Sequence, residues 1–240
     1  MQYKPEATIS HMLFSTHEDI VKAFITRVYG WMAIAMILTG VAAVLTASNP
    51  EIIELIFENN LAFISILLAQ AIMVIVLDLR MNKLSLSSAI ILFVLYSILV
   101  GISLSILFYI YTQESIALVF FVTAATFAVA SIYGMLTKAD LTRVGHLAFM
   151  ALFGIIIGSF VNLFFNNDMI YWILTYLSVI VFVLIIAYKT KEIKNMAYQM
   201  SEEGELCNKS AIFGALSLYL TFLNLLFSIL RILGRRRSNV

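Results

Sequence analysis

The stretch that decides the fold is residues 211–233, AIFGALSLYLTFLNLLFSILRIL. It is apolar and long enough to span a bilayer, whose hydrocarbon core of about 30 Å takes roughly 20 residues of helix. Small and polar residues nevertheless recur along it at alternating steps of three and four: Ser210, Gly214, Ser217, Thr221, Asn224, Ser228 and Arg231. At about 100° per residue this spacing places all seven on one narrow helix face, the polar stripe. Such a stripe must meet other helices or water inside the protein.

Composition and segment length indicate a protein with several membrane-spanning helices. Hydrophobic residues make up 62% of the 240 and charged residues 12%, with a net charge of +1 that gives no indication of nucleic acid binding. Apolar segments long enough to cross the bilayer lie at about residues 28–48, 61–80, 86–111, 115–137, 144–165, 170–188 and 211–233. We therefore predict an all-α membrane protein whose partner is the lipid bilayer. Its parts are an N-terminal segment at 1–27, a seven-helix domain at 28–234 with one long polar loop at 189–209, and a basic tail at 235–240.

The positions of lysine and arginine orient the predicted bundle. They lie before the first span and in every second connection after it: Lys4, Lys22, Arg27, Arg80, Lys83, Lys138, Arg143, Lys189, Lys191, Lys194 and Lys209. The other connections contain Asp or Glu but no Lys or Arg. Because cytoplasmic loops carry the excess of basic residues, the N-terminus is predicted to be cytoplasmic. Residues 1–27 lack the apolar core of a secretory signal, so we expect the first span to remain in the mature protein.

Three arginines at the end of the chain conflict with this orientation. Arg235, Arg236 and Arg237 follow the seventh segment, and seven full crossings leave them outside the cytoplasm. Either the last segment crosses completely in spite of the arginines, or it enters the membrane and returns to the cytoplasmic side. The first spans usually dominate orientation, which favours a full crossing. The polar stripe fits both alternatives, because a re-entrant helix is also shielded from lipid.

Small residues on two other spans indicate close helix packing. They recur at steps of four on the third and fifth predicted helices: Ser97, Gly101 and Ser105, and then Gly154, Gly158 and Asn162. Small side chains at this spacing let helix backbones approach one another. We therefore expect both helices to press against a central element.

The sequence shows none of the residue arrangements that are typical of enzymes. It contains no nucleophile elbow, paired intramembrane carboxylates, His-rich metal motif or phosphate-binding glycine loop. His146, near the start of the fifth helix, has no evident Ser, Asp or metal partner. The single cysteine, Cys207, excludes an internal disulfide and is expected to be an incidental thiol in a loop. We therefore expect no enzyme, catalytic residue, metal site or cofactor.

Polar residues in the second, sixth and seventh spans form the predicted pore or latch. They are Asp78, Arg80, Lys189, Thr221, Asn224 and Arg231, with Ser210, Gly214, Ser217 and Ser228 of the polar stripe beside them. Intramembrane polar groups are costly unless paired or hydrated, so they mark a functional site by default. Lys189 is a candidate partner for Asp78. The alternative for Lys189 and Arg231 is that the long side chains extend along the helix to the interface.

Several motifs resemble those of a known family. Residues 218–225 (LYLTFLNL) and 230–234 (LRILG) closely resemble the last-helix signature of the Bax inhibitor family of membrane proteins. Residues 187–194 (AYKTKEIK) resemble that family's motif at the end of helix six, and residues 27–29 with 39–43 are similar to the first helix of its bacterial members. The resemblance covers nearly the whole chain, in order.

This resemblance implies a bundle with its last helix at the centre of the other six, in a bacterial inner membrane. It also implies a pH-sensitive calcium leak, with a latch formed by two aspartates on helices six and seven and an arginine on helix two. Two close carboxylates share a proton because both cannot ionise cheaply. Here Lys189 and Thr221 occupy the aspartate positions, and only the arginine is kept, as Arg80. Gating by the family latch is therefore in doubt, and Lys189 opposes calcium unless an acid such as Asp78 compensates.

Two functions of different classes remain open. The first is a calcium leak pathway or its regulator, lined by the last helix, with calcium as the transported ion. The second is a non-conducting interaction protein that modulates a membrane quality-control protease or a stress or cell-death response, with its charged termini as contact points. A secondary transporter is disfavoured, since broken helices and inverted repeats are not found in the sequence.

Overall fold

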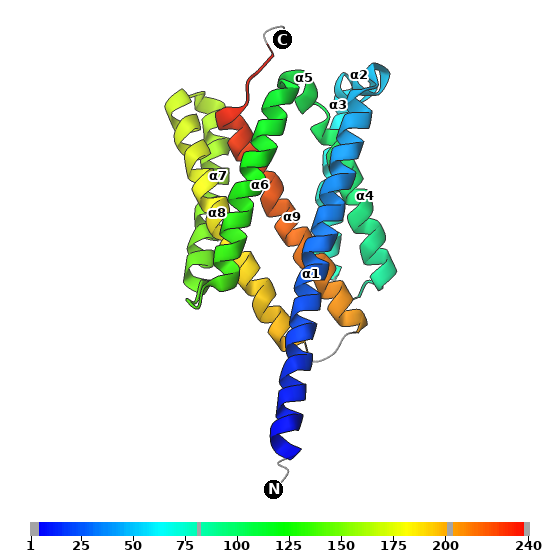
Figure 1. Cartoon of the computed structure of the whole chain (residues 1–240). Helices are drawn as coiled ribbons and strands as arrows, with labels where there is room; N and C mark the ends of the chain where they lie inside the picture. The colour runs from blue at the N-terminus through cyan, green and yellow to red at the C-terminus, as the bar shows by residue number, and fades with distance from the viewer. Residues whose placement is uncertain (1–4, 81–82, 201–203, 238–240) are drawn as a thin grey trace.

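The fold is a bundle of long helices. The computed structural model describes residues 5–80, 83–200 and 204–237, with the backbone alone for residues 5–17, 78 and 80. The described residues form α1 (Pro5–Ala47), α2 (Pro50–Phe57), α3 (Asn60–Arg80), α4 (Leu86–Leu104), α5 (Leu107–Ile110), α6 (Gln113–Leu136), α7 (Thr142–Phe165), α8 (Asp168–Gln199) and α9 (Glu205–Leu233). With α4 and α5 counted as one span, seven segments of the described chain are long and apolar enough to cross a membrane (Figure 1). The predicted all-α membrane bundle is therefore confirmed.

The polar stretch at residues 189–209, predicted as a loop, is mostly helical. α8 continues to Gln199, and α9 begins at Glu205. Cys207 consequently lies in the first turns of α9 with 2% of its surface exposed. The prediction of an incidental loop thiol is wrong, because this polar stretch still presents buried residues on one helix face.

Two lysines on the extension of α8 bind the carboxyl end of α6. Lys191 Nζ donates to Thr137 O at 2.6 Å, and Lys194 Nζ donates to Met135 O at 2.6 Å. The last carbonyl groups of a helix lack intrahelical partners, and a cation near them is also favoured by the helix dipole. These bonds explain how a stretch with so many charges remains helical and packed.

The third span, predicted as one helix at residues 86–111, is divided into α4 and α5. The division lies at Ser105, whose hydroxyl donates to Ile102 O at 2.6 Å. Side-chain bonds to nearby carbonyls compete with the helical hydrogen-bond ladder. The regular helix is therefore interrupted at residues 105 and 106, before α5 begins.

α9 is the most buried of the spanning helices. In its most apolar window 67% of the residues are buried, against 6 to 33% in the other spans. It packs against α1, α4, α6 and α8, and Figure 1 shows it crossing between α1 and α6. α7 packs mainly on α8, and α3 packs on α4. A position of α9 at the centre of all six other spans stays a prediction.

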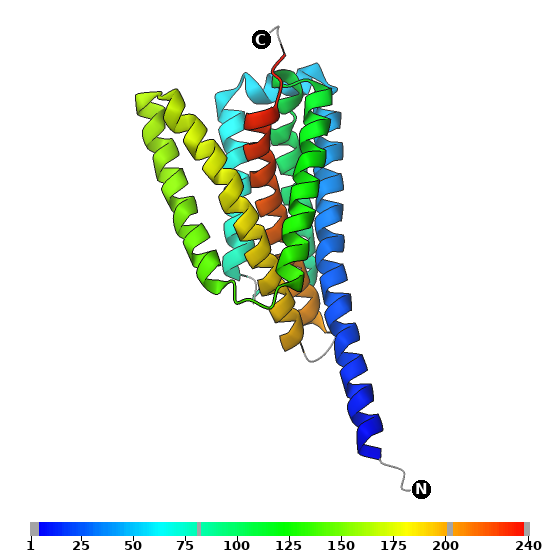
Figure 2. The same ribbon diagram turned by 60° about the vertical axis from the view of Figure 1, so that its left-hand side comes forward.

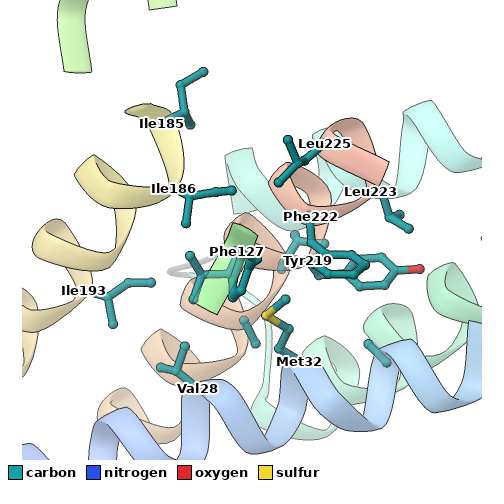
Figure 3. Close-up of a cluster of buried hydrophobic side chains, with 14 of the residues drawn as sticks. Val28, Met32, Phe127, Ile185, Ile186, Ile193, Tyr219, Phe222, Leu223 and Leu225 are labelled. Carbon is teal, nitrogen blue, oxygen red and sulfur yellow. The ribbon is translucent and has the colours of Figure 1, made fainter. Parts of the chain in front are cut away.

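Side chains from four helices form the core around α9. Figure 3 shows Tyr219 and Phe222 of α9 between residues of α1, α6 and α8, among them Val28, Phe127 and Ile186. The hydroxyls of Tyr219 and Thr39 lie 2.6 Å apart, and Thr39 is also bonded to a carbonyl of α4. These bonds join α1, α4 and α9 without leaving the buried hydroxyls unpaired.

The outer surfaces of α3 and α7 are apolar. Only 6% of the residues in the most apolar part of α3, and 11% of those in the most apolar part of α7, are buried. The exposed side chains include Leu61, which is 77% exposed, and Phe164, which is 74% exposed. Exposed apolar surface of this extent marks contact with a membrane or a partner. In a chain with seven apolar spans, lipid is the natural contact.

The two ends of the described chain lie at opposite ends of the bundle (Figures 1 and 2). α9 is continuous over 29 residues, or about 43 Å at 1.5 Å per residue, which exceeds the hydrocarbon thickness. The structure therefore favours a full crossing by the last helix over an entry and return. The cytoplasmic location of the N-terminus stays a prediction.

The predicted small-residue contacts are formed on the third span and fail in part on the fifth. A Cβ added at Gly101 collides with the carbonyl oxygen of Thr39 on α1, so α1 and α4 approach closely there. A Cβ added at Gly158 lies 3.2 Å from Leu174 on α8, whereas one at Gly154 meets no atom within 4 Å. Packing at Gly154 is therefore a wrong prediction, because that residue lies on the outer side of α7.

Candidate functional site: two polar cavities beside α9

The polar stripe of α9 divides between two cavities and the packed core. Three of its members, Ser210, Gly214 and Ser217, line a cavity of about 480 Å³ together with Lys189 and Glu192. This Lys189 cavity also includes Val74, so it lies between α3, α8 and α9. The stripe is therefore in part a cavity lining, as expected of polar residues in a membrane helix.

A second cavity lies farther along α9. It has a volume of about 350 Å³ between α3, α4 and α9, and its polar lining residues are Gln70, Tyr96, Ser103 and Asn224. In this Gln70 cavity, Gln70 Nε2 donates to Ser103 Oγ at 2.6 Å and to Leu99 O at 2.9 Å. Sequence reasoning missed Gln70. The available signal was a lone amide side chain in the middle of the second span, which is costly without a partner.

The amide groups of the Gln70 cavity use their donors within the protein. Asn224 Nδ2 donates to Leu220 O at 2.8 Å, and Gln70 uses its Nε2 as described above. Both residues also carry a side-chain amide oxygen. Amide oxygens are ligands that hard cations such as calcium accept.

Lys189 forms an ion pair on its own helix. Its Nζ lies 2.8 Å from Glu192 Oε2, and the two side chains are 24% and 39% exposed. The ammonium group also lies 5.5 Å from the centre of the Phe149 ring and 5.7 Å from that of Tyr188. Residues three apart on a helix are neighbours, but the pair was missed because this stretch was predicted as a loop. The predicted partner Asp78, like Arg80, has a side chain outside the described residues.

The remaining predicted site residues do not line either cavity in the described structure. Thr221 is 7% exposed and its hydroxyl donates to Ser217 O at 2.8 Å. Ser228 packs on α8, where it accepts a hydrogen bond of 2.9 Å from Ser178. Arg231 is exposed in the last turn of α9, near the negative end of the helix dipole. Their predicted roles in a pore or latch stay predictions.

Leu220 is the residue that the two cavities share. It lines the Lys189 cavity on one side and the Gln70 cavity on the other. We call the line of both cavities the α3–α9 seam. Along it, polar side chains lie among apolar ones, and Leu220 belongs to both linings. Among the described residues, no three His, Cys, Asp or Glu side chains gather as they would for a metal ion.

These features define an integral membrane protein of seven spanning helices with polar cavities beside its last helix. The family model described as inhibitor of apoptosis-promoting Bax1 matches residues 21–238. The chain is 42% identical over 218 residues to inner membrane protein YbhL of Escherichia coli, covering 90% of this chain and 93% of that one. It is 39% identical over 220 residues to a protein of Borreliella burgdorferi, covering 92% of this chain and 95% of that one. It is 37% identical over 223 residues to a protein of Rickettsia prowazekii, covering 93% of this chain and 94% of that one. The chain belongs to the Bax inhibitor family.

Proposed function

We propose that the protein provides a regulated leak pathway for cations, with calcium as the expected ion, along the α3–α9 seam. The observation that carries this proposal is the pair of neighbouring cavities beside α9, each of which has several polar side chains in its lining and which share Leu220. The family resemblance supports calcium as the ion. A bacterial inner membrane is the proposed location, because the Escherichia coli relative is named an inner membrane protein.

The charges along the seam are compatible with a cation. A lone lysine would oppose calcium in the Lys189 cavity, but Glu192 lies 2.8 Å from its ammonium group and compensates the charge. The family places an acid where this chain has Lys189, so Glu192 supplies a carboxylate close to that position. Neutral oxygens of Gln70 and Asn224 then follow in the Gln70 cavity.

Replacement of Leu220 by serine is expected to raise calcium flux. An apolar constriction in a pore excludes water, and a hydroxyl at the boundary of the two cavities would let water connect them. We expect an increase of about tenfold or more, which corresponds to roughly 1.4 kcal/mol of barrier. The measurement is calcium uptake into liposomes that contain the purified protein and a calcium-sensitive dye.

Leu226→Ser is the matched control for this experiment. Leu226 lies on the same helix but lines a different, apolar cavity, so its replacement adds equal polarity away from the seam. Its flux should stay at the native level. If the native protein and Leu220→Ser both fail to conduct between about pH 6 and pH 8, the leak pathway is excluded for this protein.

The alternative function is a non-conducting protein that modulates a membrane protease or a stress or cell-death response. The N-terminal segment and the exposed Arg235, Arg236 and Arg237 lie at opposite ends of the bundle (Figure 1), so one soluble partner could not contact both. Co-purification after gentle detergent extraction tests this function. A protein that purifies alone, and whose deletion leaves protease turnover unchanged, would argue against it.

A further inference from the structure

Two further cavities lie beside α1, near α5 and the first turns of α6. The head cavity has a volume of about 450 Å³, and its lining includes Ser48, Gln113 and Arg237. The tail cavity has a volume of about 110 Å³ and an almost entirely apolar lining that includes Gly40. Both are lined by Phe108, and they follow one another along successive turns of α1.

The backbone holds Arg237 at the head cavity. Its N–H donates to Ile110 O at 2.9 Å, and Thr112 N–H donates to Arg235 O at 3.1 Å. Arg236 and Tyr111 form an antiparallel bridge between these two bonds. Residues 235–237 of the chain therefore pair with the segment between α5 and α6, which places the exposed Arg237 beside the head cavity.

Gly234 and Ser115 complete the attachment of the tail. A Cβ at Gly234 would lie 2.5 Å from the ring of Tyr111, so only glycine lets the chain pass this ring. Arg235 N–H donates to Ser115 Oγ at 2.8 Å. The residues that position Arg237 thus come from α6, the segment before it and the end of α9.

The chemistry of the two cavities matches the two parts of a membrane lipid. A guanidinium group binds phosphate through parallel N–H bonds, and Gln113 and Ser48 add further polar groups. An apolar cavity does not hold water stably, and in a bilayer the apolar groups at hand are acyl chains. We propose that one anionic glycerophospholipid binds here, with its phosphate at Arg237 and part of an acyl chain in the tail cavity.

This site accounts for the arginines that conflict with the positive-inside rule. Arg235, Arg236 and Arg237 lie at the end of the bundle opposite the N-terminus, although loops on that side otherwise lack basic residues. With the N-terminus cytoplasmic, as predicted, basic residues at the opposite end work against the positive-inside rule, so a binding role gives a reason for their presence. Basic pockets between membrane helices bind lipid head groups on the cytoplasmic or matrix side, and the same attraction between guanidinium and phosphate would operate at Arg237.

Native mass spectrometry of the full-length protein with added phosphatidylglycerol tests the proposal. We expect one retained lipid per chain. Arg237→Gln should lower the bound fraction about tenfold, as expected for loss of a charge-assisted contact. Arg236→Gln is its control, since Arg236 does not line the described cavity. Retention at the native level in Arg237→Gln, or an equal loss in both variants, would overturn the site.

A second pair of variants tests the acyl part. A Cβ at Gly40 or at Gly30 meets no atom within 4 Å, so leucine at either position is compatible with the fold. Gly40→Leu should fill the tail cavity and lower lipid retention, whereas Gly30→Leu on the same helix should not. Glycerol 3-phosphate serves as a competitor without acyl chains. If it displaces the lipid as effectively as free phosphatidylglycerol does, the site is a phosphate site and the lipid proposal is refuted. If Gly40→Leu retains lipid at the native level, the acyl chain does not occupy the tail cavity and the proposed binding mode is overturned.

Discussion

Leucine in place of Gly101 should strongly destabilise the bundle. A side chain there collides with the carbonyl oxygen of Thr39, and its Cβ would lie 2.7 Å from that of Ala42. A backbone atom cannot move away by changing a rotamer, so α1 and α4 must separate. Their separation would also stretch the bond from Thr39 Oγ1 to Ser97 O, now 2.9 Å. We expect a loss of about 3 kcal/mol, at the upper end of typical overpacking.

The midpoint of thermal unfolding in detergent measures this effect. A loss of that size corresponds to a fall of roughly 10 °C for a protein of this length. Gly154→Leu is the matched control, because a Cβ at Gly154 meets no atom within 4 Å and the residue lies on an equally apolar span. Its midpoint should stay within about 2 °C of the native value. Equal falls in both variants would mean that α1 and α4 do not approach closely at Gly101.

The spans could be predicted from sequence because length and apolarity alone define a membrane helix. The requirement to satisfy every backbone group in lipid leaves a helix as the only choice for such segments. The same reasoning failed at residues 189–209, where charge was taken to mean a loop. Lys191 and Lys194 instead bind carbonyl groups of α6 across the bundle, and no local pattern reveals such bonds.

The helix face on which a residue lies could be predicted from sequence, but the residues that it contacts could not. Gly101 and Gly154 have the same spacing signature, yet one meets a backbone carbonyl and the other meets no protein atom. The polar stripe likewise predicted a shared face, while its members divide between a cavity, a second cavity and the core. Periodicity identifies the face of a residue, but the neighbouring helix decides what that face meets.

Placing acids at the two positions where the family resemblance implies them is expected to give calcium flux that depends on pH. The change is Lys189→Asp together with Thr221→Asp, which replaces a cation and a neutral side chain by two carboxylates. Lys189 already lies in a cavity of the seam, and Thr221 is bonded to Ser217, which lines the same cavity. Two carboxylates that share a site have one raised pKa, so their charge changes nearer to neutral pH than that of a lone aspartate.

The sign of this pH dependence follows from the charge. Above the raised pKa both acids are ionised, and the negative potential concentrates calcium in the seam. Flux through the double variant should therefore be higher at about pH 8 than at about pH 6, by roughly tenfold. Calcium flux through the native protein, which has Lys189 and Glu192 at this place, should change less with pH over this range. The measurement is the same dye-reported uptake into liposomes, with the pH equal on both sides.

The control for protonation is the isosteric pair Lys189→Asn with Thr221→Asn. Asparagine has nearly the shape of aspartate and cannot titrate, so it separates the loss of lysine from the gain of acids. Flux through this pair should not change with pH between about 6 and 8. If the Asp and Asn pairs behave alike, positions 189 and 221 do not form one proton-sharing site along the pathway. If only the Asp pair responds, then the native chain lacks this pH response because Lys189 and Thr221 stand at positions where two acids would share a proton.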